Sequence, residues 1–161
     1  GKTTLAYALE RRLFNQGRSC VVLDGVNMRR GLSKDLGFSA DERSENMRRS
    51  AEVACLMNAA GLICISAFVA PSEEVRQKAA QKVGVERFIT IHLSTPVEVC
   101  RERDENGMYA KADAGEINSF PGVTSEYETP SAADLTLDTT DLKVEQCVDQ
   151  IIELLEARDI Y

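Results

Sequence analysis

Short apolar runs alternate with longer amphipathic segments along most of this sequence. Short apolar runs bounded by turn residues are typical of buried strands, whereas apolar residues spaced three and four apart indicate helices. The expected strands are Cys20–Asp24, Leu62–Phe68, Phe88–Leu93 and Leu135–Leu137. The expected helices are Thr3–Gln16, Ala40–Ala60, Glu73–Val83, Pro96 to about Arg103, and Lys143–Arg158. This alternation predicts a single α/β domain over residues 1–161, doubly wound, with a mainly parallel sheet and helices on both faces.

Several helix starts carry a local signal. Ser39 and Glu42 have the spacing of a capping box, in which each side chain satisfies a free backbone N–H of the other residue. Thr95 and Glu98 have the same spacing, and Pro96 between them is expected at the first helical position. Two helices are therefore predicted to begin at these points.

Residues 105–130 have neither a helical nor a strand period. This stretch contains the turn-forming residues Gly107, Gly115, Pro121, Gly122 and Pro130. A loop this long in a compact domain is usually functional or disordered. We therefore expect part of the site to lie here.

Charge and composition argue against several classes of function. The formal net charge of −7 argues against binding of nucleic acid, which usually requires a basic surface. No apolar run approaches the ~20 residues of a membrane helix. The five cysteines have no C-x-x-C spacing, so we expect buried free thiols in a reducing cytoplasm and no zinc site. His92 lies in an apolar run and is expected to be structural.

The chain opens with Gly1-Lys2-Thr3-Thr4 directly before the first helix. This is the second half of the phosphate-binding loop G-x-x-x-x-G-K-[ST], in which backbone N–H groups surround phosphates. Lys2 would reach the β- and γ-phosphates of ATP, and the Thr3 hydroxyl would bind Mg²⁺. A short G-K-T occurs often by chance, and Lys2 as an ordinary helix-start lysine is the alternative. We expect the preceding strand, a fifth and central one, and the first glycine of the loop to lie upstream of Gly1.

Several further segments resemble the adenylylsulfate kinase (APS kinase) family, in the same order along the chain. They are LDGVNMRRGL at 23–32, LGFS at 36–39, RSENMRR at 43–49, SAFVAP at 66–71, CRERD at 100–104, GMYAKADAGEI at 107–117, and the spaced residues Phe120, Gly122, Tyr127 and Pro130. The resemblance extends from Gly1 to the last helix. It implies transfer of the γ-phosphoryl of ATP to the ribose 3′-hydroxyl of adenosine 5′-phosphosulfate.

The resemblance also implies roles for single residues. Those expected at the ATP are Gly1, Lys2, Thr3, Thr4 and Arg103, with Thr3 and Asp24 at Mg²⁺. Those expected at the acceptor are Arg29, Phe38, Arg43, Asn46, Val69, Lys111 and Phe120. Lys2, Asp24 and Lys111 would be catalytic, and residues of about 105–124 would form a lid that excludes water.

Each of these residues has a plainer interpretation. Asp24 ends an expected strand, where α/β sheets place ligands, but a carboxylate there is also a good cap or turn residue. Arg43 lies in a charged helix that can simply be solvated, and Phe38 can belong to the core. Family position favours the functional interpretation for Arg29, Arg43 and Asn46.

Three residues depart from the family pattern. Val26 replaces the second aspartate of D-G-D-N, Ala70 replaces a serine able to carry phosphate, and Asp113 replaces an arginine of the lid. Valine can neither bind a metal nor accept a proton, and general-base catalysis contributes typically about 10²–10⁴-fold. The departures motivate an alternative, a nucleotide-binding domain with a regulatory or structural role and impaired turnover, fused to ATP sulfurylase.

A nucleoside or shikimate kinase fits the opening motif but not the later ones. A homodimer is the usual assembly implied by the resemblance, and a cytoplasmic location is expected. Direct transfer between two bound nucleotides needs no phosphoserine, so Ala70 is expected to be tolerated.

Overall fold

The computed structural model describes residues 1–105 and 107–160. Its strands pair in parallel, as predicted. β1 (Cys20–Asp24) pairs with β2 (Ile63–Ala67), with Asp24 opposite Ala67, and β3 (Ile91–Leu93) pairs with β4 (Leu135–Leu137). Within the described residues no ladder joins the two pairs. A continuous five-stranded sheet therefore stays a prediction.

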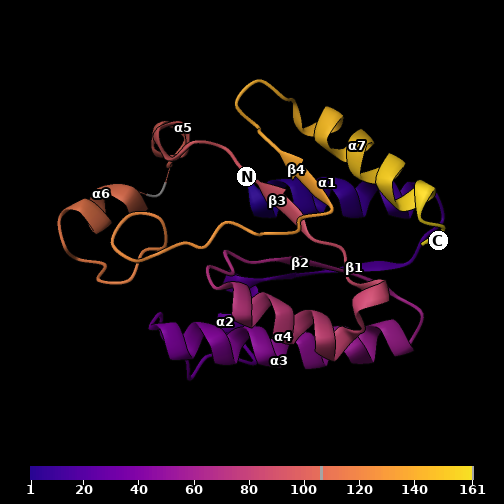
Figure 1. Ribbon diagram of the computed structural model, residues 1–161, viewed down its shortest axis with the longest axis horizontal. Helices are drawn as coiled ribbons and strands as arrows, with labels where there is room; N and C mark the ends of the chain where they lie inside the picture. The colour runs from indigo at the N-terminus through magenta and orange to yellow at the C-terminus, as the bar shows by residue number, and fades with distance from the viewer. Residues whose placement is uncertain (106, 161) are drawn as a thin grey trace.

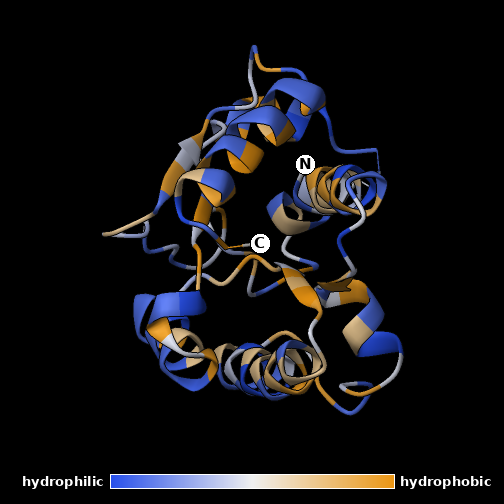
Figure 2. Cartoon of the chain, turned by 90° about the vertical axis from the view of Figure 1, so that its right-hand side faces the viewer, coloured by the Kyte–Doolittle hydropathy of each residue, from blue (hydrophilic) through white to orange (hydrophobic). Residues whose placement is uncertain are grey.

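Helices cover both sides of the strands (Figure 1). α1 (Lys2–Asn15) and α7 (Val144–Ala157) lie together on one side, and α3 (Ala40–Ala59) and α4 (Glu73–Val83) lie together on the other. Figure 2 shows that hydrophilic residues lie toward the outside of the helices. Two apolar clusters result, one around Leu13, Leu137 and Ile151 and one around Leu23 and Ala54.

The Ser39–Glu42 capping box is confirmed. Ser39 Oγ accepts from the Glu42 N–H at 3.3 Å, and Glu42 Oε2 accepts from the Ser39 N–H at 3.0 Å. The second predicted box is wrong. α5 (Val97–Glu102) begins after Pro96, which is the residue before the helix, and Thr95 makes no cap. The Thr95 hydroxyl lies 2.7 Å from that of Thr139 instead, so a tertiary contact has taken the cap residue.

Two short helices were not predicted from the sequence. α2 (Gly25–Arg30) follows β1 directly, and α6 (Met108–Asp113) lies inside the stretch expected to be a loop. Gly107 is the residue before α6, and its φ of 66° is easily adopted by glycine. The expected strand 88–93 is also shorter than predicted, because a 3₁₀ turn, η1 (Val85–Arg87), and an extended link precede β3.

The cysteines and the single histidine were also subjects of prediction. All five cysteines are free, but only Cys147 is buried, so the expectation of buried thiols is wrong for the other four. The ring of His92 stacks on Tyr127 with centroids 6.4 Å apart, and burial lowers the pKa of His92, which favours the neutral form. Across the described residues, no helix has the length and apolar character needed to cross a membrane.

Candidate functional site

The start of α1 presents unpaired polar groups. Leu5 donates to the Gly1 carbonyl at 2.9 Å, so Lys2, Thr3 and Thr4 form the first turn, and all are exposed. Within the described residues, none of these three side chains makes a hydrogen bond. Nearby atoms displace part of the hydration of Lys2 and lower the pKa of its ammonium. The turn therefore offers N–H groups, hydroxyls and a cation to an anionic ligand.

Asp24 is 3% exposed at the end of β1. Its Oδ1 accepts from the backbone N–H groups of Val26 and Asn27, each at 2.8 Å, and so caps α2. Among the described residues, its Oδ2 accepts a single hydrogen bond, from the Asn27 amide at 2.9 Å. A carboxylate oxygen can accept more than one hydrogen bond, so the capping role of Asp24 does not exclude the functional interpretation.

Asn27 connects Asp24 to α1. Its amide nitrogen also lies 3.2 Å from the hydroxyl oxygen of Tyr7. Residues four apart lie on one face of a helix, so Thr3 lies on the same face of α1 as Tyr7, which contacts Asn27. Neither Asn27 nor Tyr7 was predicted as a site residue. The position of Asn27 within the D-G-x-N segment could have indicated its role.

Arg29, Phe38 and Arg43 form one cluster. The guanidinium carbons of Arg29 and Arg43 lie 4.6 and 5.3 Å from the ring centroid of Phe38, within range of cation–π attraction. Arg29 Nε donates to the Gly37 carbonyl at 3.1 Å, and Arg43 Nε donates to the Phe38 carbonyl at 2.9 Å. Phe38 is 55% exposed, so it is not a core residue and its ring is accessible to a ligand.

Asn46 lies one turn after Arg43 on α3 and is only 2% exposed. Its side-chain oxygen has no hydrogen-bond partner among the described residues. Buried amide oxygens are nearly always satisfied, so this one is available to a donor from a ligand or water. Val69, which follows β2, is 37% exposed.

The expected lid extends to one side of the molecule around α6 (Figure 1), and residue 106 within it lies outside the described residues. Tyr109 and Phe120 make an edge-to-face contact with centroids 4.9 Å apart. Burial raises the pKa of Tyr109 to about 12, so its phenol stays neutral. Lys111 is exposed on α6, and its side chain makes no hydrogen bond in the described part of the chain.

Two arginines attach the lid to the rest of the chain. Arg43 NH2 donates to the Ser119 carbonyl at 2.7 Å, which brings Phe120 to the neighbourhood of Phe38. Arg103 donates to Thr139 Oγ1 at 3.1 Å and to the carbonyls of Thr139 and Thr140. Arg103, expected at the ATP, is thus bound to the loop after β4 in this structure.

The three departures have distinct surroundings. Val26 is 61% exposed beside the carboxylate of Asp24. Ala70 has a φ of 44°, and its carbonyl accepts from Arg76 NH1 at 2.6 Å. Asp113 forms an ion pair with Arg101 of α5, which lowers the pKa of the Asp113 carboxyl. The charge reversal in the lid therefore has a partner.

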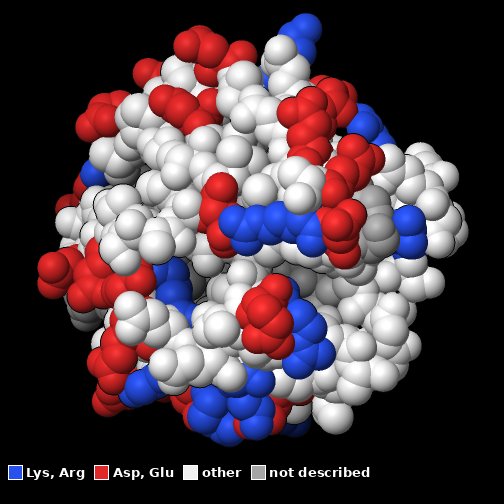
Figure 3. Space-filling model, turned by 45° about the vertical axis from the view of Figure 1, so that its right-hand side comes forward, with Lys and Arg blue, Asp and Glu red and all other residues white. Residues whose placement is uncertain are grey.

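Figure 3 shows basic and acidic side chains interspersed around a hollow on one face of the molecule. An acidic chain can still bind an anion where its cations are concentrated. The cluster of Arg29 and Arg43 around Phe38 is one such place. Lys2, at the start of α1, is another.

Comparisons with known proteins agree with this arrangement. The model of the family described as Adenylylsulphate kinase matches residues 1–138. The adenylyl-sulfate kinase of Shewanella pealeana is 51% identical over 157 residues, which cover 98% of this chain and 77% of that protein. The bifunctional enzyme CysN/CysC of Rhodopirellula baltica is 53% identical over 158 residues. The matched region covers 98% of this chain but only 24% of that larger protein.

Solved structures give the same result. The APS kinase CysC of Mycobacterium tuberculosis, in complex with AMPPNP and APS, superposes with a TM-score of 0.91 at 40% identity, covering 97% of this chain and 91% of that one. A hexameric APS kinase from Thiobacillus denitrificans gives 0.72 at 31% identity, covering 99% of this chain and 27% of that one. On family model, relatives and fold together, the chain belongs to the adenylylsulfate kinase family.

Proposed function

We propose that this chain transfers the γ-phosphoryl group of ATP to the 3′-hydroxyl of adenosine 5′-phosphosulfate, giving ADP and 3′-phosphoadenylyl sulfate for sulfate assimilation. One observation carries the proposal. The two arginines Arg29 and Arg43 flank the exposed ring of Phe38, in a chain that has the sequence Gly1-Lys2-Thr3-Thr4 at the start of α1. Stacking suits a base, and guanidinium groups suit the anionic oxygens of a phosphosulfate.

At the donor end, Lys2 and the N–H groups of Gly1, Thr3 and Thr4 would bind the ATP phosphates. The residues present fit Mg²⁺. The Thr3 hydroxyl makes no hydrogen bond to a described residue, and Asp24 Oδ2 has spare acceptor capacity. In nucleotide sites Mg²⁺ is usually held by one or two protein oxygens together with phosphates and water. When bound, Mg²⁺ would offset charge on the phosphates in the transition state.

At the acceptor end, Arg29 and Arg43 would hold the phosphosulfate, and the Asn46 oxygen would accept from a ligand donor. The adenine would stack between Phe38 and Phe120, with Val69 beside it. The lid over 105–124 would carry Lys111 to the transferred group, with Arg103 near the ATP. Asp24 Oδ2, the oxygen not used for capping, would orient the attacking hydroxyl.

Val26 favours a second candidate, a domain that binds both nucleotides with little turnover. Its exposed side chain adds no acceptor beside Asp24, which must also cap α2. Such a domain would act as a regulatory or structural module. The two candidates share the binding residues and differ only in chemistry.

A coupled ADP-release assay with Mg-ATP and adenylyl sulfate separates the candidates, using the unaltered chain, Val26→Asp and Val26→Asn. Turnover by the unaltered chain that requires adenylyl sulfate is the expected result. Val26→Asp is expected to increase kcat by about 10²-fold, the lower end of the range of general-base effects. Val26→Asn adds polarity without charge and is expected to increase kcat little. Turnover only in Val26→Asp supports the binding domain.

The assembly and location are further proposals. A homodimer is proposed, and light scattering that gives a monomer or a hexamer would contradict it. A fused or associated ATP sulfurylase is proposed because the Rhodopirellula relative is a bifunctional enzyme. A cytoplasmic location is proposed because all five cysteines are free, as is typical of a reducing compartment.

A further inference from the structure

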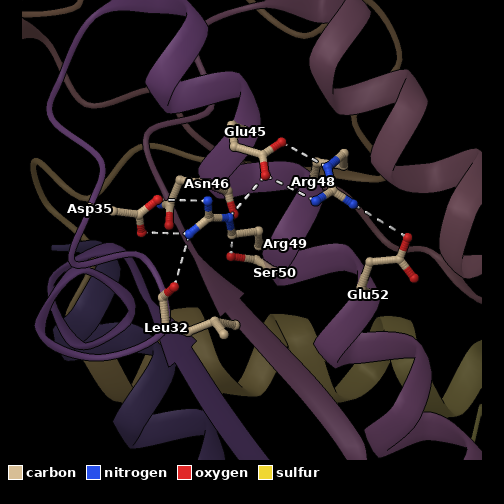
Figure 4. A network of polar contacts seen from close by, with 8 residues as sticks. All are labelled: Leu32, Asp35, Glu45, Asn46, Arg48, Arg49, Ser50 and Glu52. Atoms are coloured by element: carbon tan, nitrogen blue, oxygen red, sulfur yellow. Dashed lines mark hydrogen bonds and ion pairs between the residues drawn. The ribbon is translucent and has the colours of Figure 1, made fainter.

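A chain of ion pairs runs along α3 and ends on the loop before it (Figure 4). Arg49 forms an ion pair with Glu45 at 2.9 Å, and Glu45 forms a second one with Arg48 at 2.7 Å. Arg48 also lies 3.7 Å from Glu52. At the other end, Arg49 bonds Asp35 at 2.6 Å. The site as described so far uses none of these side chains.

Arg48 and Arg49 are neighbours with different reach. Among the described residues, the ion pairs of Arg48 are with carboxylates of its own helix, and its side chain is 59% exposed. Arg49 is 24% exposed and crosses to the loop. Its NH1 and NH2 donate to the two oxygens of Asp35, at 2.6 and 2.8 Å, and NH1 also donates to the Leu32 carbonyl at 2.9 Å. A two-point fork on a carboxylate fixes direction as well as distance.

The loop that Arg49 holds, residues 31–37, connects two parts of the acceptor cluster. Arg29 lies at the end of α2 just before the loop, and Phe38 follows it directly. Arg29 also donates to the carbonyl of Gly37, inside the loop. A displacement of the loop would therefore move the Phe38 ring and change the hydrogen bonding of Arg29 together.

Arg49 is itself poorly suited to bind the acceptor. Two carboxylates, Asp35 and Glu45, neutralise its charge, and hydrogen bonds from Arg48 and Arg49 lower the pKa of Glu45 to about 2. Its donors are directed at protein oxygens. The contribution of Arg49 must therefore come from where it holds the loop.

We propose that Arg49 is a positioning residue for the nucleotide acceptor, holding residues 32–35 so that Phe38 and Arg29 are in place before adenylyl sulfate binds. The inference rests on the proposed function. It assigns a role to the bonds from α3 to Leu32 and Asp35. It gives none to Arg48, one residue earlier on the same helix.

The test compares Arg49→Gln with Arg48→Gln in the coupled assay, with each substrate varied in turn. Arg49→Gln is expected to raise KM for adenylyl sulfate by about 5- to 50-fold, since a misplacement of about 1 Å can cost up to 10²-fold. KM for ATP and kcat should stay within about twofold of the unaltered chain. Arg48→Gln should leave all three values unchanged. Asp35→Asn, on the exposed loop, should reproduce the effect of Arg49→Gln, and Arg49→Lys should restore part of the lost affinity.

Equal rises in both KM values, or the same change in Arg48→Gln, would overturn the proposal. If Arg49→Gln does not fold, as judged by circular dichroism, Asp35→Asn decides alone. If the unaltered chain has no turnover, the proposed reaction fails, and calorimetric titration with adenylyl sulfate then replaces kinetics. Weaker binding in Arg49→Gln but not in Arg48→Gln supports the positioning role. Equal binding in both variants, or none to the unaltered chain, overturns it.

Discussion

The two ends of the candidate site differ in how their cations are held. At the acceptor end, Arg29 and Arg43 already donate to backbone carbonyls and flank Phe38. At the start of α1, where the ATP phosphates are expected, the side chains of Lys2 and Thr3 make no hydrogen bond within the described residues. Arg103, also expected at the ATP, is bound to Thr139 and Thr140 instead. One end is built by contacts of the chain with itself. The other offers unpaired groups.

This difference has a physical consequence. Groups held in place before binding lose little conformational freedom when the ligand arrives, which increases affinity. Groups without a partner gain the most from a ligand that brings charge, such as the phosphates of ATP. Substitutions at the acceptor end should therefore affect stability and binding together, whereas those at the donor end should affect activity alone.

The largest effect is expected for Lys2→Ala. Removing one donor to transition-state charge costs about 10²–10³-fold in rate, so kcat should fall by this amount. The melting temperature should stay unchanged, because the Lys2 side chain makes no hydrogen bond or ion pair with the described residues. The checks are the coupled assay and a thermal melt, with the exposed Lys78→Ala on α4 as the control. A melting temperature lowered along with activity would contradict the comparison.

A smaller effect is expected for Arg43→Ala. Hydrogen bonds to charged groups contribute about 1.5–3 kcal/mol, so affinity for adenylyl sulfate should fall by roughly 10- to 100-fold. Unlike Lys2→Ala, this change should also lower the melting temperature, since Arg43 bonds both Phe38 and Ser119. Isothermal titration and a thermal melt measure the two effects. Weaker binding with an unchanged melting temperature would show that these backbone contacts do not stabilise the acceptor end.

The sequence predicted the fold where periodicity was strong. β1, α4 and β4 have the expected bounds, and α1, α3 and α7 differ by a residue or two. Short elements were harder, because α2 and α6, of six residues each, are too brief to display a helical period. The false cap at Thr95 shows a second limit. A residue with the local pattern of a helix cap does not cap the helix when its hydroxyl is hydrogen-bonded to a distant residue, here Thr139.

The site could be predicted only in part, and mainly through family motifs. Family position identified Arg29, Phe38 and Arg43, which the structure does bring together. It could not reveal that one oxygen of Asp24 caps α2 while the other accepts from the Asn27 side chain. The pairing of Asp113 with Arg101 was equally hidden, since twelve residues and a helix start separate them.

The lid contact between Arg101 and Asp113 should matter little. Both side chains are well exposed, at 36% and 51%, and exposed pairs contribute about 0–1 kcal/mol. Asp113→Ala should therefore raise KM for ATP by no more than about fivefold. The double exchange Arg101→Asp with Asp113→Arg should recover most of the loss if the pair acts by attraction alone. A loss that persists in the double exchange would mean that the charge of residue 113 acts directly on the nucleotide.

The smallest effect concerns acid. Hydrogen bonds from Arg48 and Arg49 lower the pKa of Glu45 from the ordinary 4.5 to about 2 in the folded chain. The folded state thus favours the ionised carboxylate. The stabilisation from Glu45 is fully present above pH 4.5 and is lost as the pH falls from there toward 2.

Glu45→Gln removes this titration, so its urea midpoint should lie slightly below that of the unaltered chain at pH 7, with the gap closing as the pH falls below 4.5. Glu153→Gln, on α7, is the control for loss of a carboxylate elsewhere. Because Glu45 also bonds Arg49, acid should weaken binding of adenylyl sulfate before it weakens binding of ATP. Parallel loss of both affinities between pH 5 and 3 would mean that the two ends respond to acid as one unit, against the comparison that separates them.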